Sequence, residues 1–247
     1  MTDQSSNIVF ITGAGRRLGR HFALNFARRG YDVAVHYHTS EAGAHGTAEE
    51  IRAMGRNAVA VRADVRDAGE VRRAMREAAE ALGAPAILVA NSGIFPNPAA
   101  LAGIDGAMFA EALSVNLLGE FHAAQAFAAA QPGAGRIILI GSLGGLQIWR
   151  QRIPYNVSKS AVIQLTKALA RELAPRMAVN CVCPGAVAIA GETSGDDASM
   201  LPPERIPMQR HATPDDVFDA VYFFATASPY ITGQVLAVDG GILLTGG

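Results

Sequence analysis

Short apolar segments that alternate with helical ones limit the fold of this sequence more than any other feature. The strand-like segments, rich in Val, Ile and Ala, are NIVFIT, DVAVHYH, NAVAVRADV, AILVANSG, RIILIGS, MAVNCVCPG and QVLAVDGG. Helical patterns separate them, near residues 18–29, 41–55, 67–82, 105–131, 153–174 and 214–226. This alternation predicts an α/β fold, a doubly wound parallel sheet of about seven strands with helices on both faces.

Composition narrows the classes of partner. The 247 residues are half hydrophobic, enough for the core of one α/β domain, and no linker or repeat interrupts them. Lys plus Arg (21) nearly balances Asp plus Glu (22), which argues against nucleic acid as a partner. We see no signal segment at the amino terminus and no apolar run long enough to span a membrane, so we expect a cytoplasmic protein that binds small molecules.

The cysteines and histidines do not indicate a metal site. Cys181 and Cys183 lie two apart on a predicted strand, so their side chains face the same way, and we expect both to pack in the core. No further ligands stand near them at metal spacing, and we expect no bound metal.

A glycine turn follows the first predicted strand, where ligands bind in such sheets. Gly13 and Gly15 allow a tight turn, and the helix that follows directs its first N–H groups at an anion. Three residues separate Gly15 from Gly19, so the spacing is not G-x-G-x-x-G. Taken alone, this turn is a weak signal.

Further motifs follow the turn in a set order. They are TGAGRRLG, ADV with Asp64, ANSG, Asn116 in SVNLLG, Ser142, Tyr155 and Lys159 in YNVSK, Pro184 with Gly185, and VDGG. With this order over essentially its whole length, the sequence resembles the short-chain dehydrogenase/reductase family. The resemblance implies one Rossmann-fold domain over residues 1–247, with the cofactor part at about 1–140 and the catalytic and substrate part at about 141–247. It also implies a homotetramer or homodimer, paired through the helices near 105–131 and 153–174.

The end of the second predicted strand indicates the cofactor. It reads HYHTS, without the acidic residue that NAD-binding folds place at the ribose hydroxyls, so we expect NADP(H). Arg17, His36, Thr39 and Ser40 are expected to donate hydrogen bonds to the 2′-phosphate, with Arg16 adding charge. The alternative is that both arginines are solvated surface residues. The other cofactor contacts that the resemblance implies are Gly13, Gly15, Leu18, Gly19, Asp64, Val65, Asn91, Ser92, Gly93, Tyr155, Lys159, Pro184, Gly185 and Val187.

The catalytic set is carried by the resemblance and agrees with simple chemistry. Tyr155 and Lys159 are four apart on a predicted helix and share one face, so the ammonium can favour a tyrosinate. The resemblance implies that Tyr155 exchanges a proton with the substrate oxygen, which Ser142 also hydrogen-bonds, and that Asn116 holds a water linking Lys159 to solvent. Ile189 stands where the family often has a threonine that touches the cofactor carboxamide.

The substrate stays open. TGAGRRLG and HYHTS resemble the pteridine reductase branch, in which an aromatic residue, here Phe95, stacks a pterin. Gly93 and Ser142 depart from that branch, so we favour a ketone or 3-oxoacyl reductase, with a dihydropterin or dihydrofolate reductase as the alternative. A non-catalytic NADP-binding sensor or scaffold is the alternative of another class. Trp149 is a candidate wall of the substrate site, Arg150 and Arg152 are expected to be solvated, and residues 188–208 are a candidate lid.

Overall fold

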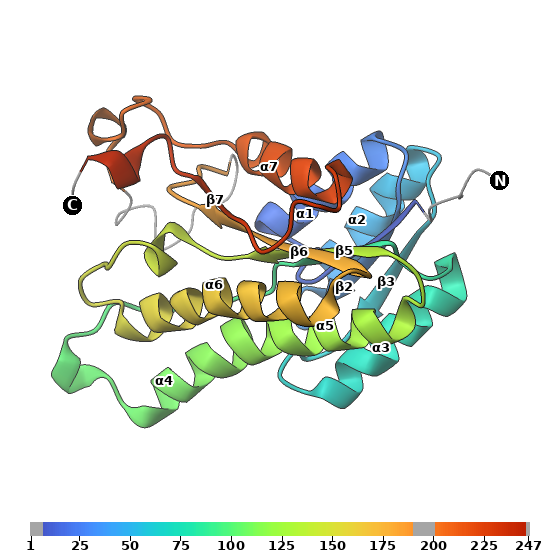
Figure 1. The fold of residues 1–247 in the computed structure, drawn as a ribbon, viewed down its shortest axis with the longest axis horizontal. Coiled ribbons are helices and arrows are strands. Elements are labelled where there is room, and N and C mark those ends of the chain that lie inside the picture. Colours follow the sequence, from blue (N-terminus) through green and yellow to red (C-terminus); the bar gives the residue numbers. More distant parts are fainter. Residues whose placement is uncertain (1–6, 190–200, 246–247) are drawn as a thin grey trace.

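One parallel sheet forms the centre of the molecule (Figure 1). The computed structural model describes residues 7–189 and 201–245. Seven strands pair in parallel in the order β3-β2-β1-β4-β5-β6-β7. Their bounds are β1 Ile8–Ile11, β2 Asp32–Tyr37, β3 Ala58–Arg62, β4 Ile87–Ala90, β5 Gly135–Ile140, β6 Met177–Pro184 and β7 Val235–Val238. The expected strands and the doubly wound class are confirmed.

Helices cover both faces of the sheet (Figure 1). One face is packed by α1 (Arg17–Arg28), α2 (Glu41–Ala53) and α7 (Pro214–Thr226), and its core includes Phe22, Phe26 and Phe218. The other is packed by α3 (Ala68–Leu82), α5 (Gly119–Ala130) and α6 (Ile153–Leu173), with Met75 and Phe127 buried between the helices and the sheet. Strands that carry apolar side chains on both faces require this two-sided cover, because each face must be kept from water.

The ends of these helices follow from local sequence. Asp67 caps α3 by accepting the N–H groups of Gly69 and Glu70, at 2.7 and 3.0 Å. Thr213 and Asp216 form a capping box at α7, directly before Pro214 at the first helical position. These signals agree with the helix positions that the pattern predicted.

The helix expected near 105–131 is not continuous. It divides into α4 (Gly106–Leu113), a π-helical turn over Ser114–Leu118, and α5. A π turn inserts an extra residue into the helical ladder and is frequent at functional sites. Asn116 lies at the centre of this turn.

The sheet topology places the ligand site. The chain moves outward from β1 to β2 and β3 and then returns to β4 on the other side of β1. This reversal opens a crevice beyond the carboxyl ends of β1 and β4. Most of the candidate lid cannot be placed, because residues 190–200 lie outside the described residues. No helix among residues 7–189 and 201–245 is both long and apolar enough to cross a bilayer.

Candidate active site

The glycine turn after β1 is built by close backbone approach. Gly13 has φ of 64°, in the left-handed region that glycine adopts without strain. Gly19 lies so close that an added Cβ would stand 2.1 Å from the Gly13 carbonyl oxygen. A Cβ on Gly15 would stand 2.9 Å from the Ser40 carbonyl oxygen. The glycines let α1 begin directly behind the turn, which is the arrangement that presents helix N–H groups to a phosphate.

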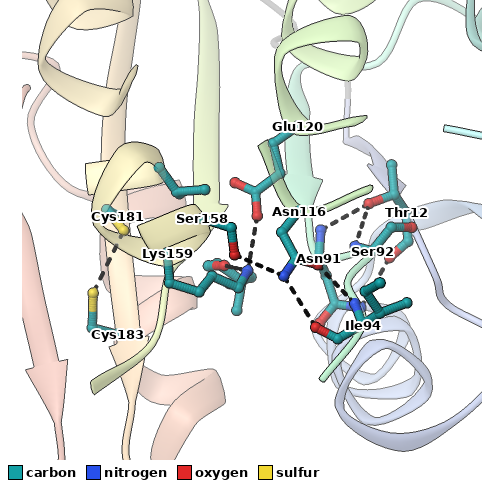
Figure 2. A network of polar contacts seen from close by, with 12 residues as sticks. Thr12, Asn91, Ser92, Ile94, Asn116, Glu120, Ser158, Lys159, Cys181 and Cys183 are labelled. Carbon is teal, nitrogen blue, oxygen red and sulfur yellow. Dashed lines mark hydrogen bonds and ion pairs between the residues drawn. The ribbon is translucent and has the colours of Figure 1, made fainter. Parts of the chain in front are cut away.

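Two side chains tie this turn to the end of β4 (Figure 2). Thr12 Oγ1 accepts the backbone N–H groups of Asn91 at 2.8 Å and Ser92 at 2.9 Å. The Asn91 amide donates back to the Thr12 carbonyl oxygen at 3.0 Å. Asn91 therefore joins the two strands that flank the crevice, while its part in cofactor binding stays a prediction.

His36 does not face the cofactor, and the prediction that it binds the 2′-phosphate is wrong. The side chain is 1% exposed, because helices cover both faces of β2 and every residue of the strand after Asp32 is buried. Its Nδ1 accepts the Gly13 N–H at 3.2 Å, and its Nε2 donates to the Ala63 carbonyl oxygen at 3.1 Å. Burial lowers the pKa of His36 to about 4, so the ring is neutral and serves as a support under the glycine turn.

The rim around the end of β2 is basic and polar. Arg16, Arg17, Thr39 and Ser40 all line the cleft there, and His38 occupies the place that had been expected for His36. Arg17 has φ of 51°, a left-handed conformation that is uncommon outside glycine. No carboxylate belongs to the segment of residues 36–40, so this rim suits a phosphate group better than a pair of ribose hydroxyls.

Asp64 lies farther along the same rim, with an unexpected partner. Arg66 Nε donates to both carboxylate oxygens, at 3.0 and 2.8 Å, and its Nη2 lies 2.5 Å from Oδ2. These hydrogen bonds lower the pKa of Asp64. The adenine contact expected of Asp64 stays a prediction, and Arg66 adds a second cation to this part of the cleft.

Ser142 and Tyr155 meet at the other end of the cleft. Ser142 follows β5, is 5% exposed, and accepts the Gly144 N–H at 3.1 Å. An added Cβ on Gly144 would stand 3.1 Å from Tyr155 Cε1, so the segment after β5 passes directly against the phenol ring. Both side chains line the cavity.

Lys159 lies one turn beyond Tyr155 on α6 and is 4% exposed. Its Nζ donates to the Ile140 carbonyl oxygen at 2.6 Å and to Glu120 Oε1 at 3.2 Å (Figure 2). Burial acts to lower the pKa of Lys159, but attraction to Glu120 and Tyr155 outweighs it and raises the pKa. Burial also raises the pKa of Glu120, to about 8, against the opposing effect of Lys159.

Asn116 is fully buried behind the cleft. Its Oδ1 accepts the Ile94 N–H at 2.7 Å, and its Nδ2 donates to the Ile94 carbonyl oxygen and to Ser158 Oγ, both at 3.0 Å (Figure 2). Its side chain thus joins the π turn, the segment after β4, and α6. The water expected on Asn116 stays a prediction.

One cavity of about 1000 Å³ connects the basic rim to the end that Ser142 and Tyr155 line. Phe95 packs edge-on to Tyr155 with ring centroids 4.4 Å apart, and Trp149 stacks parallel to Tyr155 at 6.0 Å. Arg152 lies with its guanidinium carbon 3.9 Å above the Phe95 ring centroid and is 7% exposed. The expectation that Arg152 is solvated is therefore wrong, because it caps the aromatic wall.

The comparisons with known proteins cover nearly the whole chain. The family model that matches residues 13–243 is described as enoyl-(acyl carrier protein) reductase. A 3-oxoacyl-[acyl-carrier-protein] reductase of Staphylococcus epidermidis is 34% identical, with 96% of this chain and 98% of that protein covered. An L-rhamnose 1-dehydrogenase (NAD(P)(+)) of Azotobacter vinelandii is 32% identical over 96% of both chains. The chain belongs to the short-chain dehydrogenase/reductase family.

A solved structure agrees with this assignment. A short-chain dehydrogenase of Burkholderia cenocepacia, in complex with NADP, superposes on this short-chain dehydrogenase/reductase with a TM-score of 0.88 at 32% identity, covering 98% of this chain and all of the other. The protein is therefore an oxidoreductase with the Rossmann fold that its sequence predicted.

The structure gathers most of the predicted site residues of this short-chain dehydrogenase/reductase around the single cavity. Only His36 and Asn116, of all those expected in the site, do not line it. Ile189, where the family often has threonine, also lines it. Those that do line it are Gly13, Gly15, Arg16, Arg17, Leu18, Gly19, Thr39, Ser40, Asp64, Val65, Asn91, Ser92, Gly93, Phe95, Ser142, Trp149, Tyr155, Lys159, Pro184, Gly185 and Val187.

Sequence reasoning missed three contributors. Thr12 lies in the turn motif TGAGRRLG. Its role comes from its Oγ1, which accepts the backbone N–H groups of the two residues that follow β4. Glu120 is a lone acid at the start of an alanine-rich helix, a signal that could have marked it. Arg152 had no such signal. Within residues 7–189 and 201–245, no group of three or more His, Cys, Asp or Glu side chains is placed to hold a metal ion.

Proposed function

We propose that this protein is an NADPH-dependent reductase that transfers a hydride between the nicotinamide and a carbonyl or alcohol substrate, of the ketone or 3-oxoacyl type. The observation that carries the proposal is the placement of Ser142, Tyr155 and Lys159 at one end of a cavity whose other end is basic. A non-catalytic sensor has no need of this set beside an apolar pocket. The family and its NADP-bound neighbour support the same reading.

The described residues fit NADP(H). A Cβ would collide with backbone oxygens at Gly15 and Gly19, and Gly13 has a left-handed φ, so the turn keeps the bare backbone that a pyrophosphate needs to approach. Arg16 and Arg17 would meet the 2′-phosphate, and Lys159 would hold the nicotinamide ribose. When bound, the dinucleotide supplies the hydride.

The chain's own side chains supply the proton chemistry. Tyr155 donates its phenolic proton to the substrate oxygen during reduction and accepts one during oxidation. Ser142 holds that oxygen by a hydrogen bond, and the cation of Lys159 favours the phenolate that the reduction leaves behind. Aromatic cover from Phe95 and Trp149 keeps bulk water from the phenol.

The pocket favours an apolar carbonyl substrate. Apart from Arg150, Arg152 and two glutamines, the lining near Tyr155 and Phe95 is mostly apolar: Ile94, Phe95, Pro98, Leu143, Trp149, Ala186, Leu201 and Ile242. A ketone fits such a wall because its single acceptor oxygen is satisfied by Ser142 and Tyr155. A relative that carries the name of a 3-oxoacyl reductase agrees with this class.

The structure does not favour the pterin alternative. A pterin sandwich needs an open face on Phe95, but Arg152 covers one face and Tyr155 contacts the ring as well. Ser142 is also a poor acid for protonating a ring nitrogen. Pterin reduction is therefore kept as an outcome of the test.

The test is NADPH oxidation against a 3-oxoacyl thioester, small cyclic and aromatic ketones, and a dihydropterin, with Tyr155→Phe beside the wild type. We expect turnover of a ketone or thioester that falls at least about 100-fold in the variant, because the variant lacks the proton donor. Tyr155→Phe should still bind NADPH, measured by fluorescence, with an affinity lower by no more than the loss of one hydrogen bond, about 10-fold. Turnover of dihydropterin alone would refute the ketone assignment, and equal rates for both proteins with every substrate would refute Tyr155 as the acid.

We propose that the enzyme assembles as a cytoplasmic homotetramer, with a homodimer as the alternative. Several large apolar side chains stay exposed on the two helices that the resemblance places at the subunit contacts. Leu118, the last residue of the π turn, and Phe121, on the first turn of α5, are 45% and 36% exposed, and Ile153 and Val157 on α6 are 38% and 42% exposed. Apolar residues exposed together on neighbouring helices are typical of a surface that another copy covers.

A further inference from the structure

A buried acid stands directly behind the active-site lysine. Glu120, on the first turn of α5, is 2% exposed, and its Oε1 lies 3.2 Å from Lys159 Nζ on α6 (Figure 2). Asn116, on the π turn, and Ser158, on α6, hydrogen-bond to each other, and neither shows a hydrogen bond to this carboxyl among the described residues. The mechanism outlined above makes no use of Glu120.

The second carboxyl oxygen of Glu120 is buried without a hydrogen-bond partner among the described residues. A carboxylate spreads its charge over both oxygens, and an ionised one would leave half of that charge unsatisfied in a dry site. A protonated carboxyl places no such charge there. The contact with Lys159 partly offsets the cost but satisfies only one oxygen.

We propose that Glu120 is a positioning residue of the active site: its carboxyl carries a proton in neutral solution, releases it as the pH rises, and so sets the net charge beneath Tyr155. With the proton in place, Glu120 is neutral and Lys159 contributes a full positive charge. Loss of the proton to solvent leaves a carboxylate that cancels the lysine charge. The effect on Tyr155 rests on the proposed function, whereas the protonation of Glu120 does not.

Other titratable groups lie around the Glu120–Lys159 pair, but none of them is in the same position to set its net charge. Tyr155 and Lys159 face it from α6, and Cys181 and Cys183 face it from β6, with their Sγ atoms 3.7 Å apart and both fully buried. The hydrogen bond between the two thiols raises the pKa of Cys181 and lowers that of Cys183, while burial opposes the ionisation of both. The Glu120 carboxyl differs from them because it contacts Lys159 Nζ directly, so its titration, with a pKa raised to about 8, changes the net charge of the pair itself.

The first arm of the test is spectroscopic and needs no substrate. Difference infrared spectra of the whole protein between neutral and alkaline pH, with isotope-labelled glutamate to separate Glu from Asp, report a protonated glutamic acid directly. We expect one protonated glutamate band that is lost as the pH rises and that is absent in Glu120→Gln. If the wild type shows no protonated glutamate at neutral pH, the proposal is wrong, whatever substrate the enzyme uses.

The second arm is the pH profile of ketone reduction for Glu120→Gln. The variant keeps an amide oxygen for Lys159 but cannot become negative, so the phenolate is favoured at lower pH. We expect the alkaline limb to move about one pH unit lower than in the wild type, as for the loss of one charge several ångströms away. The exposed Glu172→Gln, on α6, should leave the profile unchanged.

An unchanged profile in Glu120→Gln, or a shift to higher pH, would overturn the charge-setting role. A shift to higher pH would mean that Glu120 keeps Lys159 charged as its counter-ion instead. If Glu120→Gln does not fold, Glu120→Asp serves as the second variant: it keeps an acid, and we expect the labelled glutamate band to be replaced by an unlabelled aspartic acid band with an altered titration. Absence of any ketone turnover in the wild type would refute the proposed function, while the infrared arm would still decide the protonation of Glu120.

Discussion

At the scale of single residues, charge and burial decide what each polar side chain does. Arg17 and His36 were assigned the same task from the sequence, yet one lines the cleft and the other is enclosed beneath it. His36 lies in a strand that helices cover on both faces, whereas Arg17 sits on a turn where its backbone is left-handed. Two residues that a sequence pattern assigns to the same phosphate can therefore have different roles, one lining the cleft and the other supporting it from beneath.

Arg17→Ala should lose much of the preference for NADPH. A guanidinium that meets the 2′-phosphate contributes about 1.5–3 kcal/mol, so we expect the KM for NADPH to rise about 10- to 100-fold while the KM for NADH changes little. Steady-state kinetics with both cofactors measures this. Arg76→Ala, on the exposed side of α3, is the matched control and should behave as the wild type. Equal effects on the two cofactors would contradict the phosphate contact.

His36 should make the fold sensitive to acid. Its pKa is about 4 in the folded protein and about 6.5 when unfolded, so the unfolded state binds more protons between these values. Stability is complete above pH 6.5 and is lost as the pH falls toward 4, by roughly 3 kcal/mol in total. Urea unfolding at several pH values should show a smaller loss in His36→Gln than in the wild type. Parallel curves for the two proteins would contradict this account.

At the scale of elements, backbone proximity governs more than propensity does. Gly19 and Gly46 are both helical glycines, but a Cβ at Gly19 would collide with the Gly13 carbonyl oxygen while one at Gly46 would meet open space. The same substitution is therefore expected to have opposite effects in α1 and α2.

Gly19→Ala should destabilise the protein by about 2 kcal/mol or more and weaken NADPH binding, because the turn or the helix must shift. Gly46→Ala should stabilise it by about 0.5–1 kcal/mol, since alanine is the better helix former and nothing obstructs it. Chemical denaturation and NADPH fluorescence measure both effects. Equal stability of the two variants would show that the close approach in the turn is not required.

The elements also show where sequence reasoning succeeds and fails. The strands and most helix bounds follow from periodicity and caps such as Asp67 and Thr213, which are local signals. The π turn at Asn116 and the pairing of Glu120 with Lys159 join segments 39 or more residues apart. Hydrophobic periodicity cannot predict a contact between such distant segments. The burial of Arg152 against Phe95 is likewise a result of tertiary packing that the sequence pattern does not show.

At the scale of the whole molecule, the exposed apolar face of α5 and α6 bears on assembly. Phe121→Glu places a charge on that face, and we expect a shift to smaller species in sedimentation experiments, because a buried unpaired charge disfavours association. Met54→Glu, a 40% exposed site after α2, should leave the assembly unchanged. A monomeric wild type, or an unaltered Phe121→Glu assembly, would exclude this surface.

Helix α6 has two working sides. Tyr155 and Lys159 line the cleft, while Ile153 and Val157, which lie two residues before them, are exposed on the outside. Because a helix is rigid along its length, a movement of its outer surface also moves the side chains that line the cleft. A substitution on the outer surface that tilts α6 would also change the direction of the Tyr155 phenol. We therefore expect the exposed residues of α6 to be substituted more slowly in evolution than their exposure alone would predict.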